Sequence, residues 1–354
     1  MKFEWMDWPR RVNNLQVDVT SYCNARCGAC VRNIDGDVVK PEIPMVHFDV
    51  DAWNRLVSED TRGWFIVEMT LNGNWGDPMM HPKLVEMLQT YSIYHPESAV
   101  YIHTNGSMRT QKFWYELGRT CRKFSNHAVV FAIDGLEDTH SIYRRKTDFN
   151  KIVENIEAFV SGGGRAKVVM TLFEHNKHQV KDVEKLADDL GCVGFNLRHT
   201  HGDNLEIKTV EGDYKIFGNY DTDEYDILWE DRDSRRLSDL RDYHTYLDMI
   251  DETRERYAKD EQKCPWYSDG RIQIDPWGTV WPCCHLSLYG IDIVNHDLNT
   301  MVNELSFIKA REQNSILDKS LIDVLRSGWW RNDLNDAIEN AEWKQCRDIC
   351  GICK

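Results

Sequence analysis

The sequence predicts an α/β protein, a partial (β/α)6 barrel followed by a small C-terminal α+β domain. Three observations predict it. Short apolar strands alternate with amphipathic helices from residue 15 to residue 200, an order typical of a parallel sheet. Residues 202–263 then shift toward Asp, Glu, Gly and Tyr without a clear period. A hairpin pattern and a second set of cysteines follow from Cys264. We therefore divide the chain into a barrel at 1–200, an acidic connector with one helix at 201–263, and a C-terminal domain at 264–354.

Six strands are expected in the barrel, each a short apolar segment. They are Gln16–Thr20, Phe65–Leu71, Ala99–His103, Ala128–Ile133, Ala166–Leu172 and Gly194–Arg198. The helices between them have apolar residues at helical spacing. They are Phe48–Ser58, Pro82–Tyr94, Gln111–Cys121, Asn150–Ser161 and Lys177–Leu190. In a TIM-like barrel of this kind the active site lies at the carboxyl ends of the strands, so residues just after each strand are candidates for function.

The composition excludes several classes of protein. The chain has 354 residues, of which 42% are hydrophobic and 29% charged, as in ordinary globular proteins. No run of about 18 apolar residues occurs, so no transmembrane helix is expected. The first residues lack the apolar segment of a signal peptide, and we predict a cytoplasmic protein. The net charge of −15 argues against nucleic-acid binding, which depends on Lys and Arg neutralising phosphates.

Three cysteines directly follow the first expected strand. Cys23, Cys27 and Cys30 have the spacing C-x3-C-x2-C, and an intracellular chain with cysteines in such groups favours a metal site over disulfides. Thiolates are the usual protein ligands of iron–sulfur clusters, and three of them leave one iron of a four-iron cluster open. The alternative is structural zinc, which takes four ligands. No fourth Cys or His lies near this loop, since the first His is His47.

This loop resembles the cluster loop of the radical SAM enzymes, which carries C-x3-C-x2-C after the first barrel strand. The resemblance implies a [4Fe–4S] cluster whose open iron binds the amino and carboxylate groups of S-adenosylmethionine. Family members usually have an aromatic residue just before the last cysteine. Here that position is Ala29, so we expect the pocket for the adenine to differ.

A glycine-rich turn follows the second expected strand. It contains Gly73, Gly76, Asp77 and Pro78, and such a turn lets the backbone approach a ligand. A plain turn is the alternative. The segment resembles the family's G-G-E-P motif, whose backbone and acid hold the amino group of S-adenosylmethionine. Asp77 is one methylene shorter than the usual Glu, and the motif has one extra residue.

Thr104 and Asn105 directly follow the third expected strand, in a Thr-Asn-Gly sequence. Small polar side chains at this place suit hydrogen bonding to a ribose or to the substrate, and an ordinary Asn-Gly turn is the alternative. A Thr-Asn-Gly sequence at a strand end also occurs in the family, which favours the cofactor site.

Polar residues after the later strands complete the expected cofactor site. The segment from Asp134 to Arg144 resembles the family's D-G-x-x-E-x-H-x-x-Y-R, which lines the cofactor pocket. The resemblance implies that an arginine there meets the carboxylate of S-adenosylmethionine, and we choose Arg144 with Arg145 as the alternative. We also expect Asn176 and Arg198 to point into the mouth of the barrel.

The C-terminal cysteines predict a second metal site. A hairpin turned at Asp275–Gly278 brings Cys283 back toward Cys264. The spacing C-x13-G-x4-C resembles the start of the SPASM motif, and the few cysteines that follow resemble its shortened Twitch variant. The resemblance implies one auxiliary [4Fe–4S] cluster held by Cys264, Cys283, Cys350 and Cys353, with Cys346 able to replace one of them. A zinc site is the alternative, since zinc also accepts four thiolates.

The resemblance implies an enzyme that reductively cleaves S-adenosylmethionine to a 5′-deoxyadenosyl radical, which abstracts a hydrogen atom from a substrate. The expected oxidoreductase oxidises or cross-links a peptide or protein side chain. The alternatives are a Twitch-type dehydrogenase or carbon-skeleton enzyme acting on a small molecule, and a non-catalytic zinc- or cluster-binding protein. The implied partner is an electron donor such as flavodoxin or ferredoxin. No catalytic side chain is predicted.

Overall fold

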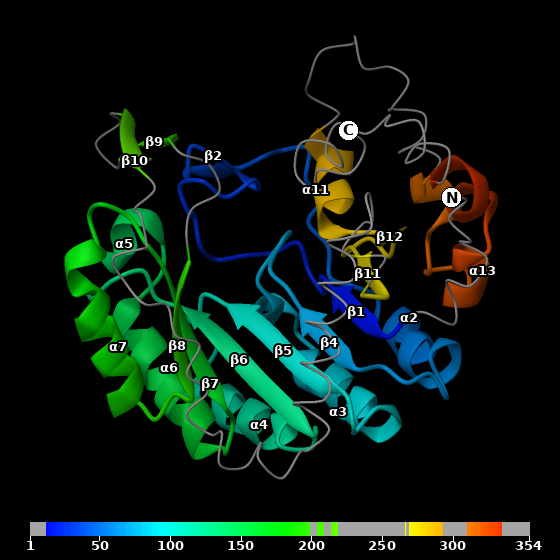
Figure 1. The fold of residues 1–354 in the computed structure, drawn as a ribbon, viewed down its shortest axis with the longest axis horizontal. Helices are drawn as coiled ribbons and strands as arrows, with labels where there is room; N and C mark the ends of the chain where they lie inside the picture. Colours follow the sequence, from blue (N-terminus) through cyan, green and yellow to red (C-terminus); the bar gives the residue numbers. More distant parts are fainter. Residues whose placement is uncertain are drawn as a thin grey trace, which may run out of the picture.

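One mixed sheet forms the frame of the molecule (Figure 1). The computed structural model describes residues 12–198, 204–208, 214–218, 266, 269–292 and 310–334. The sheet has eight strands in the order β12-β11-β1-β4-β5-β6-β7-β8. The barrel strands are β1 (Asn14–Val17), β4 (Glu68–Leu71), β5 (Ala99–Thr104), β6 (Asn126–Ala132), β7 (Ala166–Thr171) and β8 (Gly194–Arg198). Each is parallel to the next, as predicted from the alternation of strands and helices.

Helices cover one face of this sheet, on the outer side of the curve in Figure 1. They are α2 (Val50–Arg55), α3 (Leu84–Tyr94), α4 (Gln111–Cys121), α6 (Phe149–Ser161) and α7 (Val180–Asp189), with the short α5 (His140–Tyr143) beyond the end of β6. Side-chain caps start several of them. Asp49, Thr110 and Asp148 accept hydrogen bonds from main-chain N–H groups in the first turns of α2, α4 and α6. The caps set the starts of these helices at Val50, Gln111 and Phe149, where the sequence predicted Phe48, Gln111 and Asn150.

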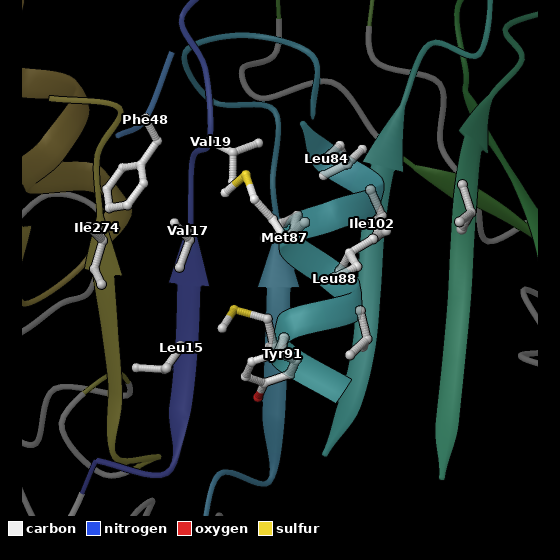
Figure 2. Close-up of a cluster of buried hydrophobic side chains, with 14 of the residues drawn as sticks. Leu15, Val17, Val19, Phe48, Leu84, Met87, Leu88, Tyr91, Ile102 and Ile274 are labelled. Atoms are coloured by element: carbon white, nitrogen blue, oxygen red, sulfur yellow. The ribbon is translucent and has the colours of Figure 1, made fainter. Parts of the chain in front are cut away.

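The hydrophobic core lies between the sheet and these helices (Figure 2). Leu15, Val17 and Val19 from the first strand and its extension point to this side, where Met87 and Leu88 of α3 meet them. Side chains alternate along a strand, so the residues between them point to the opposite face. That inner face is polar at the first strand, where it receives Gln16 and Asp18. It is apolar at β6 and β7, where Val130, Ala132 and Val169 form a small cluster.

A C-terminal hairpin extends the sheet beyond β1. β11 (Arg271–Ile274) pairs parallel to β1, with Leu15 opposite Ile272, and antiparallel to β12 (Val280–Trp281). The hairpin itself is confirmed, but the sequence did not predict that it joins the barrel sheet. Asp275 holds its turn by accepting hydrogen bonds from the N–H groups of Trp277 (3.0 Å) and Thr279 (2.9 Å) and from Trp281 Nε1 (2.8 Å). The division into domains stays a prediction.

Smaller elements complete the described chain. β2 (Asn33–Ile34) and β3 (Val38–Val39) form a short hairpin after Cys30, and β9 (Asn204–Lys208) pairs antiparallel with β10 (Tyr214–Gly218) within the expected connector. α11 (Cys284–Asp292) follows β12, and α13 (Leu321–Leu325) precedes a π-helical turn at Trp329–Asp333. The helix expected in the connector lies outside the described residues. Among the helices that the structure describes, none has the length and apolar character needed to cross a membrane.

Candidate functional site

The three-cysteine loop leaves β1 and crosses the carboxyl edge of the sheet. Cys23, Cys27 and Cys30 are free thiols; Cys27 is buried and the other two are partly buried. Main-chain bonds fold the loop on itself, with Cys30 N–H donating to Cys27 O (3.3 Å) and Asn33 N–H to Cys30 O (2.8 Å). The Asn33 side chain also donates to Cys27 O, at 3.1 Å. The loop is thus held in one compact conformation.

The thiols lie close enough to influence one another. Burial raises the pKa of Cys27 to about 11, and Cys30 and Asp134 add to the rise while Arg144 opposes it. Burial likewise raises the pKa of Cys23 above its ordinary range, and Asp77 and Cys27 act in the same direction. Without metal these two thiols are protonated at neutral pH. Metal binding must therefore release protons from them.

The glycine-rich turn after β4 packs directly against this loop. A Cβ on Gly76 would collide with the main-chain oxygens of Thr20 and Tyr22, so only glycine fits there. The next residue donates its N–H to Tyr22 O at 2.8 Å. The turn and the residue before Cys23 are therefore in direct contact, as expected if both border one ligand.

Asp77 joins the turn to the end of β5. Its buried carboxylate accepts hydrogen bonds from Met79 N (2.9 Å), Thr104 Oγ1 (2.9 Å), Asn105 N (2.8 Å) and Asn105 Nδ2 (2.6 Å). Burial raises the pKa of Asp77, and these donors counteract the rise. The carboxylate is thus occupied by donors of the protein itself, and Pro78 follows it as the first residue of a 3-10 turn, Pro78–Met80.

Asn105 connects β5 to the cysteine loop. Its Nδ2 donates to Asn24 Oδ1 at 3.0 Å and lies 3.8 Å from Cys23 Sγ. Asn24 in turn donates to Ser107 Oγ at 2.7 Å. The ends of β1, β4 and β5 therefore meet in one hydrogen-bonded network, which brings together the predicted residues Gly76, Asp77, Thr104 and Asn105 around Cys23.

Asp134, which is fully buried, forms an ion pair with the partly buried Arg144 beside the loop. Arg144 Nε lies 2.6 Å from Asp134 Oδ2, and Arg144 Nη1 lies 3.9 Å from Cys27 Sγ. The other oxygen of Asp134 accepts from Thr171 N at 2.6 Å, which ties the pair to β7. The Arg145 side chain instead donates to Asp35 O at 3.0 Å. Of the two arginines considered from the sequence, Arg144 is the one beside the thiols.

The last two sequence candidates differ in their surroundings. Asn176 is buried, and its side chain donates to Thr171 O (2.8 Å) and accepts from Phe173 N (2.7 Å). Its amide therefore stabilises the loop after β7 rather than facing a ligand. Arg198 ends β8 with an exposed side chain that interacts electrostatically with Arg144 and Asp134. Gly73 lies in the turn after β4, and its N–H bonds Asn72 Oδ1 at 2.9 Å.

Two features of the site escaped the sequence analysis. Arg32 is a buried cation next to Cys23, although it was detectable as the only arginine just after the cysteine motif, two residues beyond Cys30. Ala29 packs with Phe173 and Tyr143, whose ring centroids lie 4.6 Å apart. Aromatic side chains from after β6 and β7 therefore contact the residue just before the last cysteine. No local pattern in the sequence indicates that contact.

Only one expected ligand of the second cluster lies in the described part of the chain. Cys283 is buried directly after β12, and Cys284 begins α11. Cys264, Cys346, Cys350 and Cys353 lie outside the described residues. The remaining two cysteines, Cys121 and Cys192, are buried among apolar side chains.

The donors present fit a cluster at the first loop. Three free thiols approach one another there, and Arg32 and Arg144 bring positive charge that favours thiolates. In the described ranges, no three Cys, His, Asp or Glu side chains converge closely enough to hold a single metal ion. A four-iron cluster binds each cysteine thiolate at a different iron.

Comparisons with known proteins agree with this arrangement. Residues 17–189 match the model of the Radical SAM superfamily. The fold is similar to that of Streptococcus suis SuiB bound to S-adenosylmethionine, with a TM-score of 0.53 and 15% identity over 92% of this chain and 68% of that one. SuiB bound to the precursor peptide SuiA has a TM-score of 0.52 and 14% identity, over 92% of this chain and 66% of that one. Native anSMEcpe with bound AdoMet and Cp18Cys peptide has a TM-score of 0.50 and 15% identity, over 96% of this chain and 88% of that one. These likenesses confirm the predicted partial barrel.

Proposed function

We propose, from the radical SAM domain that residues 17–189 carry, that this chain is an enzyme that reductively cleaves S-adenosylmethionine and oxidises or cross-links a peptide or protein side chain. The observation that carries the proposal is the meeting of the three-thiol loop with the ends of β4, β5 and β6. The cysteines, the Gly76 turn, Asn105 and Arg144 all border the same loop. Such convergence is expected of a cofactor site and not of an isolated metal knuckle.

The cofactor chemistry needs little from the protein beyond binding and position. When bound, the cluster supplies one electron that cleaves S-adenosylmethionine into methionine and a 5′-deoxyadenosyl radical, and this radical takes a hydrogen atom from the substrate. We assign Cys23, Cys27 and Cys30 as the cluster ligands. Buried surroundings keep water from the site, as the burial of Cys27 and Asp134 indicates.

The remaining residues position S-adenosylmethionine. Because the Asp77 carboxylate already accepts from Met79, Thr104 and Asn105, we propose that the main chain of the Gly73–Pro78 turn meets the amino group. Arg144 and Arg198 bring positive charge to the same edge, which suits the carboxylate. Asn176 and Asp134 keep Arg144 and the adjoining loop in place.

The peptide substrate is the finer part of the proposal. Two of the solved structures with this fold hold peptides, SuiA in SuiB and Cp18Cys in anSMEcpe. The inner face of the sheet carries both polar and apolar side chains, which is compatible with a peptide. We further propose an auxiliary [4Fe–4S] cluster held by Cys264, Cys283, Cys350 and Cys353, with Cys346 as the substitute ligand. A protein such as flavodoxin or ferredoxin is the proposed electron donor.

The cleavage of S-adenosylmethionine tests this function and needs no substrate. The reconstituted chain, incubated anaerobically with dithionite and S-adenosylmethionine, is expected to form 5′-deoxyadenosine and methionine. Cys27→Ala should reduce that formation at least about 100-fold, because the cluster loses a ligand and then its iron. Chromatography of the nucleoside products gives the rate.

Cys121→Ala is the matched control, since it removes an equally buried free thiol on α4 that does not touch the loop. Its rate should stay close to that of the wild type. Cleavage that survives Cys27→Ala would refute the assignment. Zinc without sulfide in the purified chain would favour the non-catalytic alternative instead.

A further inference from the structure

Arg32 is a buried guanidinium without a carboxylate partner in the described part of the chain. Arg32 is only 1% exposed to solvent. Nη2 donates to Ser21 O at 2.5 Å and lies 4.0 Å from Met45 Sδ. Nε and Nη1 are buried and have no hydrogen-bond partner among the residues that the structure describes. A cation buried in this way has lost its hydration, and few contacts with the protein replace it.

Such burial is costly, because a charge removed from water needs an opposite charge or a full set of hydrogen bonds. Arg144 provides the comparison within the same site. It is also held inside the protein, but Asp134 lies 2.6 Å from its Nε and neutralises it. Within the described ranges, the Arg32 guanidinium has only the main-chain oxygen of Ser21 and the sulfur of Met45 as partners. The structure therefore contains a positive charge whose balancing negative charge is still to be identified.

The group next to Arg32 is the cysteine loop. Ser21 lies two residues before Cys23, and Arg32 lies two residues after Cys30. The hydrogen bond from Arg32 to Ser21 O therefore joins the two ends of the loop. Arg26, inside the loop, also donates to the main-chain oxygen of Cys23 at 3.1 Å, but that residue is only partly buried.

We propose that Arg32 is the internal counter-ion of the cluster held by Cys23, Cys27 and Cys30. This inference rests on the proposed function. Three thiolates give the loop a negative charge that the guanidinium balances. Each electron added to the cluster makes the assembly more negative, so a fixed cation stabilises the reduced state and raises the reduction potential. Net charge and hydrogen bonding are among the factors that set cluster potentials.

The reduction potential of the loop cluster tests the proposal. It is measured by EPR-monitored redox titration of the reconstituted full chain without S-adenosylmethionine, for the wild type, Arg32→Met and Arg32→Lys. Arg32→Met should shift the potential to a more negative value, and Arg32→Lys, which keeps the charge, should stay closer to the wild type. Arg145→Met is the control, because it removes a nearby guanidinium that donates to Asp35 O.

The thermal stability of metal-free and cluster-loaded protein gives a second readout. A counter-ion role predicts that Arg32→Met leaves the Tm of the metal-free chain unchanged or higher, since an unbalanced charge is removed. The same change should lower the Tm of the loaded chain. If Arg32 had only a structural role, Arg32→Met would lower the Tm of the metal-free and the loaded chain by the same amount.

An unchanged potential in Arg32→Met, or an equal loss of Tm in both forms, would overturn the counter-ion role and leave the proposed function standing. A wild-type chain that binds neither iron nor sulfide would overturn both. The iron and sulfide content of the wild type therefore separates the two failures.

Discussion

Gly76 illustrates how single residues shape the site. It lies where the turn after β4 crosses the cysteine loop, and its missing side chain lets the two backbones touch. The contact places Asp77 N–H on Tyr22 O, directly before the first cysteine. The glycine thus acts on the cysteines through the position of the loop.

Replacing Gly76 with alanine should displace the cysteine loop. The new methyl group would collide with the oxygens of Thr20 and Tyr22, and overpacking of this kind costs about 1–3 kcal/mol. We expect lower stability in urea unfolding and a loss of most of the iron bound by the loop after reconstitution.

Gly328→Ala is the control for that change. Gly328 has helical backbone angles, and an added Cβ would meet only Gln313 Oε1, at 4.0 Å. This variant should keep its iron and its stability. If Gly76→Ala also kept both, the turn would not be what positions the loop.

At the scale of elements, Asp18 links three parts of the fold. Its main-chain N–H donates to Ile274 O at 2.9 Å, and its carboxylate accepts from Gln273 Nε2 (2.7 Å) of β11 and from Asn74 N (3.2 Å) of the turn after β4. Asp18 is fully buried, and burial raises its pKa well above the ordinary value, against the effect of the Asn74 and Gln273 donors. The same carboxylate that joins β1 to β11 is therefore costly to ionise.

This raised pKa predicts how stability depends on pH. A group whose pKa is higher in the folded state contributes stability below its unfolded pKa and loses it as pH rises through the folded pKa. The free energy of unfolding of Asp18→Asn, relative to the wild type, should therefore rise as the pH increases above about 4, the ordinary pKa of aspartate. Urea unfolding across this range measures the slope.

Asp37→Asn, which removes an exposed carboxylate in the β2–β3 hairpin, is the comparison for Asp18→Asn. What matters is how the difference in the free energy of unfolding between Asp18→Asn and the wild type changes with pH. The amide also alters the hydrogen bonds, but that contribution to the free energy does not depend on pH. If this free-energy difference stayed constant from acid to neutral pH, the pKa of Asp18 would be the same in the folded and unfolded states, and the prediction would be wrong.

At the scale of the whole molecule, local patterns predicted the barrel and long-range contacts supplied what they missed. The strands and helices follow from periodicity, and the cysteine loop from its spacing. The pairing of β1 with β11 joins residues more than 250 positions apart, as Leu15 with Ile272, and no local pattern records it. The same holds for Asp77 with Asn105 and for Ala29 with Phe173, which only the folded chain brings together.

The boundaries that differ have local causes. The first strand was expected at Gln16–Thr20 but begins at Asn14, where neighbouring strands pair on both sides. The second was expected from Phe65, but that side chain is 76% exposed and β4 begins only at Glu68. In both cases the apolar pattern located the strand, and pairing with neighbours decided its ends.

The binding of S-adenosylmethionine to the loop cluster tests the central claim most directly. The measurement is the EPR spectrum of the reduced Cys283→Ala variant, which removes one proposed ligand of the auxiliary cluster and should lower the iron content from about eight to about four per chain. We predict a spectrum of one reduced [4Fe–4S] cluster that changes when S-adenosylmethionine is added, because the open iron gains a ligand. A spectrum that is absent, or that S-adenosylmethionine leaves unchanged, would contradict the account.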